Sequence, residues 1–252
     1  MFLLGMVFVG KLVSLLFLCF VIQWAGIDQA KADALPLEIV CTQWRPYIFR
    51  ENAVFSGPVY DIAKQVLDRA GITFKYTIEP WARVYHNGLT VNNYLIGCLG
   101  RTPARENLFH WIGPVTQGID IYFYKLKSNP ITVTTLEQAK QYEVVTERGS
   151  YNHDFLRLKG FDNEKIFPMT SNEQAMSLLS INRYPLYLIS EDRMVSLAKY
   201  KGIDPSIFER VLFAFSVKDY LAFSRNTSSV LVKKVAAAYE ALQAEGKIML
   251  PK

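Results

Sequence analysis

Three loops of the chain concentrate arginine and aromatic side chains, and each loop lies next to an expected β-strand. The residues are Trp44 and Tyr47 in the first loop, Trp81 and Arg83 in the second, and Arg101 and Arg105 in the third. Arginine presents a planar fork of N–H donors that matches a carboxylate or a phosphate, and aromatic rings form flat apolar walls. The three loops therefore predict a cleft that binds a small polar ligand.

Each of these side chains also has an ordinary structural role open to it. A loop tryptophan such as Trp44 usually packs against the domain that carries it. A loop arginine is usually solvated or joined to a neighbouring acid in a weak surface pair, and Arg105 stands beside Glu106. The concentration of arginines at successive strand ends favours binding over these alternatives.

A fourth loop, in the second half of the chain, indicates the same chemistry. Gly149, Ser150 and Tyr151 follow an expected strand and open a helix, whose free backbone N–H groups and dipole suit an anion. Glu173 and Glu191 are the two acids that this half of the chain places near a cleft.

The chain carries no recognisable catalytic or metal-binding motif. Its three histidines are scattered, and it lacks a nucleophile elbow, a phosphate loop, a dinucleotide fingerprint and a Cys-x-x-Cys pair. The net charge of +5 is spread without a run of like charges, which argues against a nucleic-acid partner. We therefore expect a binding protein rather than an enzyme, with no cofactor and no metal.

Strand and helix patterns alternate along the chain and would position these loops. Strands are expected at 37–40, 72–78, 94–99, 119–124, 142–146, 187–189 and 220–224, and helices at 58–70, 84–89, 136–141, 151–159, 175–181, 193–200 and 228–245. Such alternation produces parallel sheets covered by helices. Because the pattern forms two units with a C-terminal return, we expect two lobes and a ligand cleft at the carboxyl ends of their strands.

The N-terminal segment predicts export. Residues 12–22 form an apolar run after Lys11, and Ala30 and Ala32 are the small residues of a signal-peptidase site. We expect residues 1–32 to be a signal peptide cleaved near Ala32 and the mature protein to be periplasmic. An uncleaved membrane anchor is the alternative, because the apolar stretch also extends before Lys11.

Two cysteines remain after the signal peptide, Cys41 and Cys98, and an oxidising compartment permits a disulfide between them. Both lie in expected strands, where a cysteine often serves as a small buried apolar side chain. Neighbouring parallel strands, moreover, rarely meet disulfide geometry. The sequence alone leaves this bridge open.

Several of these segments resemble the family 3 periplasmic solute-binding proteins, the amino-acid-receptor type of ABC importers. Residues 44–47 resemble the family's aromatic-x-Pro-aromatic loop, 57–63 its Gly-Phe-x-x-Asp-Leu-Ala helix entry, and 102–105 its Thr-x-x-Arg motif. Residues 80–83 resemble the Pro-Trp-x-Arg motif of one branch of the family. The resemblance spans roughly residues 36–250.

The resemblance implies a type II periplasmic-binding-protein fold. Each lobe would be a mostly parallel sheet flanked by helices, and two crossover strands would join the lobes. Lobe 1 would comprise residues 33–117 with 217–252, and lobe 2 residues 118–216.

The resemblance also implies roles for single residues. Arg105 takes the place of the arginine that clamps a ligand's carboxylate, and Trp44 that of the stacking aromatic residue. Gly100 and Thr102 would lend backbone and hydroxyl contacts, and residues 149–151 would form the anion loop of the second lobe.

One position departs from the family pattern. Amino-acid binders of the family carry an aspartate after the last strand of the second lobe, where it holds the ligand's ammonium group. Here Ser190 stands at that position and Glu191 follows it. The departure favours an acid without a free amine, or another anionic small molecule, over a standard α-amino acid.

These observations predict a monomeric periplasmic solute-binding protein. It would capture a small polar, carboxylate-bearing ligand, anionic or zwitterionic, in an interlobe cleft for an ABC-type importer with an inner-membrane permease. One alternative is a dehydratase-like enzyme on the same scaffold, with Glu173 or Glu191 as its acid. The other is a ligand-binding sensory module that works with a membrane sensor and transports nothing.

Overall fold

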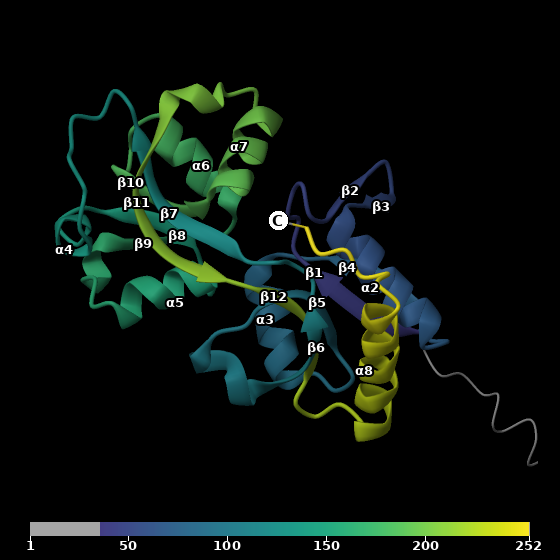
Figure 1. Ribbon diagram of the computed structural model, residues 1–252. Coiled ribbons are helices and arrows are strands. Elements are labelled where there is room, and N and C mark those ends of the chain that lie inside the picture. Colours follow the sequence, from purple (N-terminus) through teal and green to yellow (C-terminus); the bar gives the residue numbers. More distant parts are fainter. Residues whose placement is uncertain (1–35, 252) are drawn as a thin grey trace, which may run out of the picture. The chain divides into compact units, whose positions relative to one another are not determined.

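The structure, a computed structural model, describes residues 36–251, which form two five-stranded sheets with helices packed against them (Figure 1). The signal peptide expected at residues 1–32, like the alternative anchor, lies outside the described residues. No helix in the described part of the chain is both long enough and apolar enough to span a membrane.

The first sheet has the strand order β4-β1-β5-β12-β6. Its strands are β1 (Leu37–Cys41), β4 (Phe74–Ile78), β5 (Leu95–Gly100), β6 (Phe109–Pro114) and β12 (Asp219–Ser224). Strand β1 runs parallel to β4 and β5, whereas β12 runs antiparallel to both of its neighbours. Packed around this sheet are α2 (Pro58–Arg69), α3 (Trp81–Thr90), α8 (Ser229–Ala244), the 3-10 turn η1 (Pro103–Leu108) and a hairpin of β2 (Phe49–Glu51) and β3 (Val54–Ser56).

The second sheet has the strand order β11-β7-β10-β8-β9. Its strands are β7 (Ile119–Leu126), β8 (Val144–Glu147), β9 (Ile166–Met169), β10 (Leu186–Ser190) and β11 (Phe208–Val217). Strand β8 runs parallel to β9 and β10, and β7 runs antiparallel to its neighbours. Its helices and turns are α4 (Leu136–Ala139), α5 (Tyr151–Leu158), η2 (Asn163–Lys165), α6 (Asn172–Ser180), α7 (Glu191–Tyr200) and η3 (Pro205–Ile207).

The chain crosses between the two sheets twice, after β6 and again between β11 and β12. The two crossings are joined by hydrogen bonds. The Val115 N–H donates to the Asp219 carbonyl at 2.7 Å, and the Asp219 N–H donates to Thr116 Oγ1 at 3.0 Å. A pair of short connections between two packed units is the usual position of a hinge.

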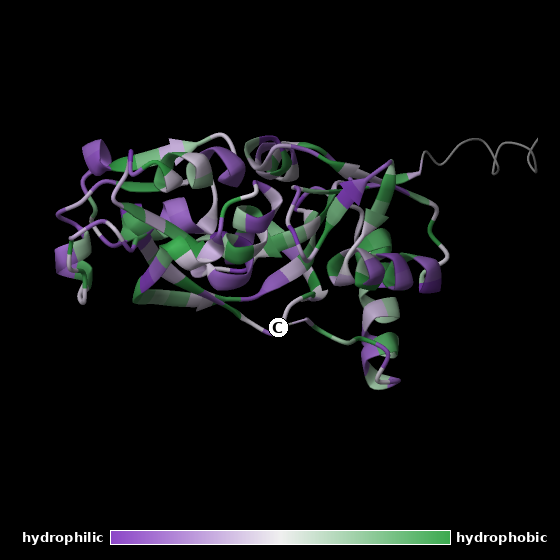
Figure 2. Cartoon of the chain, turned by 90° about the horizontal axis from the view of Figure 1, so that it is seen from above, coloured by the Kyte–Doolittle hydropathy of each residue, from purple (hydrophilic) through white to green (hydrophobic). Residues whose placement is uncertain are grey.

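Helix α2 illustrates why these residues form these elements. Its buried residues lie on one face at helical spacing, namely Val59, Ile62, Ala63, Val66 and Leu67. The next glycine, Gly71, has φ of +59°, the left-handed conformation in which a chain commonly leaves a helix. The strands carry much of the hydrophobic colour in Figure 2, and the helices carry both colours, as expected when helices shield a sheet from water.

The α/β fold class predicted from sequence is confirmed, with helices flanking each sheet. In each sheet two of the four strand pairings are parallel and two are antiparallel. Strands β6, β9 and β11 and the β2–β3 hairpin have no counterpart among the expected strands. The first three are edge strands, and an edge strand has a neighbour on one side only, which weakens its burial pattern. In addition, β9 contains Pro168, and β11 has two bulges against β7.

Candidate binding site

The structure contains a partly enclosed cavity, called here the central cavity, to which both sheets contribute. Its free volume is about 30 Å³, which is room for little more than ordered water. The lining residues are Thr42, Trp44, Trp81, Cys98, Glu147, Ser150, Tyr151, Asn152, Asn172, Ile189, Ser190, Arg193 and Asp219.

Strand ends place most of these residues. Glu147 and Ser190 are the last residues of the parallel strands β8 and β10, and Thr42 follows β1 directly. Parallel strands bring their carboxyl ends to the same edge of a sheet. Asp219 arrives from the opposite direction, as the first residue of the antiparallel strand β12.

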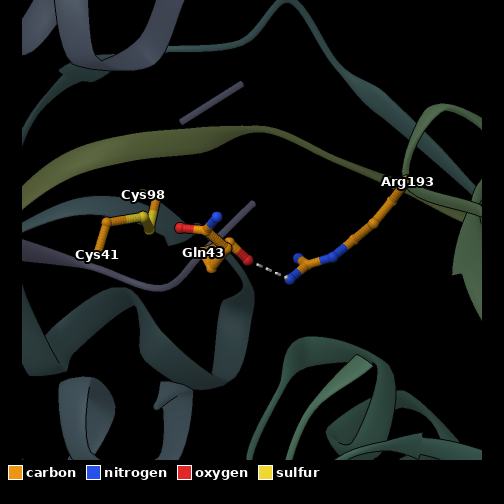
Figure 3. Close-up of a disulfide and its surroundings, with 4 residues drawn as sticks. All are labelled: Cys41, Gln43, Cys98 and Arg193. Atoms are coloured by element: carbon orange, nitrogen blue, oxygen red, sulfur yellow. Dashed lines mark hydrogen bonds between the residues drawn. A yellow bond between two sulfur atoms is a disulfide. The ribbon is translucent and has the colours of Figure 1, made fainter. Parts of the chain in front are cut away.

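A disulfide between Cys41 and Cys98 joins β1 to β5 at this edge (Figure 3). The pairing register places Val40 opposite Ile96, so the two cysteines are diagonal neighbours, and their Cα atoms are 5.7 Å apart, within the usual range. The bridge that the sequence left open is therefore formed. It anchors the loop of Gln43, whose carbonyl accepts a hydrogen bond of 3.1 Å from Arg193 Nη2.

Glu147 is a buried acid that a chain of hydrogen bonds holds in place. Burial raises the pKa of its carboxyl, and the nearby Arg193 charge and a hydrogen bond from Asn172 oppose the rise. The amide oxygen of Asn172 in turn accepts a hydrogen bond of 2.6 Å from the Tyr187 hydroxyl. Because that oxygen is occupied, the Asn172 side chain presents its NH₂ group to Glu147.

Asp219 is a second buried acid in the cavity, and it is 2% exposed. Burial raises the pKa of its carboxyl from 3.8 to about 7, although the charges of Arg193 and Arg105 act in the opposite direction. Its Oδ2 atom has no hydrogen-bond partner among the described residues. A buried carboxylate oxygen without a donor is costly, so this position favours a ligand that supplies one.

Three other cavity residues also have a buried polar atom without a partner in the described chain. Trp44 Nε1 and Arg193 Nε are donors, and Asn152 Oδ1 is an acceptor like Asp219 Oδ2. Unsatisfied donors and acceptors between aromatic walls are what a binding site for a small polar molecule requires. The arrangement can therefore hold a ligand that has both accepting and donating groups.

Arg105 lies next to the cavity and is engaged by protein groups. It is 1% exposed, and its Nη2 atom donates to Asp154 Oδ2 at 2.8 Å and to the Gly149 carbonyl at 3.2 Å. Its guanidinium also lies 4.6 Å from the ring centre of Tyr85. Arg105 does not belong to the residues that line the central cavity.

The Arg105–Asp154 ion pair is one of several contacts between elements of the two sheets. Trp81 Nε1 donates to the Gly149 carbonyl at 2.8 Å, and the Tyr47 hydroxyl donates to Asp192 Oδ2 at 2.7 Å. Burial and the hydrogen bond to Asp192 raise the pKa of the Tyr47 hydroxyl. These contacts hold the cavity closed.

Of the site residues expected from sequence, Trp44, Trp81, Ser150, Tyr151 and Ser190 line the central cavity. The others lie outside its lining, and they are Tyr47, Arg83, Gly100, Arg101, Thr102, Arg105, Gly149 and Glu191. Three of these form ion pairs with neighbouring side chains, namely Arg83 with Glu79, Arg101 with Glu106, and Glu191 with Arg210. Gly100 still has a role in the geometry, because a Cβ atom there would overlap the Tyr151 ring.

Sequence reasoning missed the charged residues of the cavity, Glu147, Arg193 and Asp219. Glu147 had a usable signal, since it ends a strand immediately before the loop at 148–151. Arg193 and Asp219 had no such signal in the sequence. Arg193 lies on the first turn of α7, and Asp219 lies next to a crossing whose position the sequence marks only weakly. Glu173 and Glu191, the two acids considered for catalysis, do not line the cavity. Within residues 36–251, no cluster of histidine, cysteine or acidic side chains is arranged to hold a metal.

Comparisons with known proteins agree with this geometry. The profile of the bacterial extracellular solute-binding proteins, family 3, matches residues 39–249. A comparison with curated proteins gives no match.

Solved structures share the fold at low sequence identity. A histidine kinase sensor domain with similarity to periplasmic binding proteins is 13% identical, with a TM-score of 0.74 over 84% of this chain and 92% of that one. The P235GK mutant of ArgBP from T. maritima is 16% identical, with a TM-score of 0.72 over 88% and 95%. The arginine-, lysine-, histidine-binding protein ArtJ from Geobacillus stearothermophilus is 14% identical, with a TM-score of 0.68 over 85% and 92%. With two sheets, two crossings and a family profile that covers most of its length, the chain belongs to the bacterial extracellular solute-binding proteins, family 3.

Proposed function

We propose that the protein captures a small polar, carboxylate-bearing solute in the periplasm and presents it to an ABC-type importer. The observation that supports this function most directly is the central cavity, which is partly enclosed, has aromatic walls and is lined by buried polar atoms without partners among the described residues. Each such atom destabilises the closed form on its own. A ligand that pairs with them therefore stabilises closure.

Closure and opening are part of the proposal. Small-molecule pockets commonly measure about 300–1,000 Å³, whereas the cavity holds about 30 Å³. A solute must therefore enter when the sheets separate about the paired crossings, and the sheets then close around it with a larger cavity than in this structure. Opening separates Trp81 from Gly149, and Arg105 from Asp154.

Two arginines are placed to hold the ligand's carboxylate. Arg193 lines the cavity and has a free Nε donor among the described groups. Arg105 lies beside the cavity, and Asp154, its partner, belongs to α5 on the second sheet. When the sheets separate, Asp154 withdraws and a ligand carboxylate takes its place on the Arg105 guanidinium.

A thermal-shift screen of the purified protein tests this function. The panel contains amino acids, dicarboxylates, aromatic acids, phosphates and polyamines. A ligand at a hundredfold its dissociation constant adds about 2.7 kcal/mol, which is a shift of roughly 5–10 °C for a chain of this size. We expect Arg193→Ala and Arg105→Ala to reduce the shift and the exposed Arg225→Ala to leave it unchanged. A panel without any shift, or a shift that survives both of the first two variants, contradicts the proposal.

A sensory module is the second candidate, favoured by the similarity to a histidine kinase sensor domain. The two functions share the ligand site and differ in what reads the closed form. A permease gene next to the coding gene, together with loss of solute uptake on deletion, supports transport. Loss of a transcriptional response to the solute with normal uptake supports sensing. Mass spectrometry of the bound solute after prolonged incubation tests the enzyme alternative, and we expect the solute to be unchanged.

A further inference from the structure

The central cavity has more acidic than basic side chains. Its lining contains the carboxyl groups of Glu147 and Asp219 and one guanidinium group, that of Arg193. Arg105 lies outside the lining and is paired with Asp154 at 2.8 Å, although its charge also acts on Asp219. Arg193 is therefore the one basic side chain that lines the cavity beside two buried acids.

Arg193 is not committed to either acid by a hydrogen bond. Its Nη2 atom donates to the neutral carbonyl of Gln43, as Figure 3 shows, and its Nε atom has no partner in the described chain. Its charge acts on both carboxyl groups through space. One delocalised cation at this position leaves one negative charge uncompensated when both acids are ionised.

Asp219 shows most clearly where a second cation is needed. Its Oδ2 atom is buried and without a donor, although its backbone is fixed at both ends by hydrogen bonds to the first crossing. The hydrogen bond that its N–H group makes to Thr116 therefore holds the residue in place and does not satisfy the carboxylate. The missing donor must come from inside the cavity.

Glu147 offers the second acceptor. Asn172 is the side-chain donor that supports its carboxyl group, and a carboxylate accepts up to about four hydrogen bonds. The aromatic walls add to the effect, since the faces of Trp44 and Trp81 attract cations and both rings line the same cavity.

We propose that the ligand carries a protonated amine, which binds between Glu147 and Asp219, and that the ligand's net charge is positive. This inference rests on the proposed function and names the ligand class, an organic cation, and the two residues that select it. It differs from the anionic ligand that the sequence favoured, because the lining acids were not visible there.

Isothermal titration calorimetry with probe pairs of equal size and different charge tests the inference. The pairs are L-arginine with L-citrulline and L-lysine with L-2-aminoheptanoic acid. A charged hydrogen bond contributes about 1.5–3 kcal/mol, so we expect the cationic member to bind roughly 10- to 100-fold more tightly. Asp219→Asn should bring each pair to within a few-fold, and Glu147→Gln should reduce the preference. The exposed Asp61→Asn should leave it unchanged, and circular dichroism confirms that each variant folds.

Further probes separate this inference from the function on which it rests. Agmatine is arginine without the carboxylate, and binding of arginine in preference to agmatine supports the carboxylate-bearing ligand of the proposed function. Three results would overturn the inference and leave the proposed function standing. They are equal binding of the two members of each charge pair, tighter binding of L-glutamate than of the cationic probes, and a charge preference that survives both acid variants. If neither these probes nor any member of the screening panel binds, the proposed function fails, and this inference fails with it.

Discussion

Replacing Asp219 with asparagine should make the ligand-free protein more stable at alkaline pH. The folded protein raises the pKa of this carboxyl from 3.8 to about 7, so between these values the folded state binds more protons than the unfolded state. Stability must then fall as pH rises. The contribution is fully present below the ordinary pKa of the acid and is lost as pH passes the raised value.

The size of the effect follows from the shift. A shift of about three pKa units corresponds to roughly 4 kcal/mol, of which about 3 kcal/mol is lost between about pH 4.5 and pH 8. The full penalty applies to a group as deeply buried as Asp219, which is 2% exposed. The asparagine side chain of the variant has nearly the same shape as aspartate and no charge, so it does not carry this penalty.

Urea-induced unfolding of wild type and Asp219→Asn across this pH range measures the effect. The quantity of interest is the difference in free energy of unfolding between the two proteins, because the titrating groups outside the cavity cancel in it. We expect the difference to grow with pH by about 3 kcal/mol in favour of the variant. The exposed Asp61→Asn serves as the matched control, with a difference that does not vary by this amount. Parallel pH profiles for wild type and Asp219→Asn would refute the argument that Asp219 is a buried, uncompensated acid.

Three further predictions concern the frame of the site. Replacing both Cys41 and Cys98 with alanine removes a link across 57 residues and should cost about 4 kcal/mol in urea unfolding; the loss should match that of wild type under reducing conditions. Gly100→Val should displace the Tyr151 ring that packs against Gly100, weaken ligand binding in calorimetry and lower stability by about 1–3 kcal/mol through overpacking. Arg105→Ala removes the hydrogen bonds that this buried guanidinium makes to Asp154 and to the Gly149 carbonyl and should lower stability by about 1–3 kcal/mol. Arg105→Lys should restore little of it, because a single ammonium cannot contact both partners.

The sequence predicted every interior strand of the two sheets and, of the edge strands, β4 alone. The strand at 94–99, for example, lies within one residue of β5, whose residues are all buried, so its apolar run is unbroken. By contrast, β11 alternates poorly because it has one neighbour and two bulges. The hydrophobic pattern of a single sequence therefore reveals a strand that is buried on both sides more reliably than a strand at the edge of a sheet.

The site was predictable in its aromatic half and not in its charged half. Trp44 and Trp81 each follow a strand of the first sheet. The rule that ligands bind at the carboxyl ends of strands therefore places both side chains in the cavity, where they lie. The same rule placed Arg105 in the cavity, whereas the structure buries it against Asp154 on another element, 49 residues away. Pairing between side chains so distant in the chain depends on how the sheets meet, which no local pattern encodes.

The position of Asp219 connects the charge of the cavity with its closure. The residue lies at the crossing between β11 and β12, and its backbone is bonded to the other crossing. In this structure the carboxylate is buried and its Oδ2 atom has no donor among the described residues. That arrangement carries an electrostatic cost, which a bound cation removes. On the proposed function, a solute without a donor group fills the space but leaves the carboxylate uncompensated at the crossing, whereas a solute that brings the missing donor stabilises the contact between the two sheets.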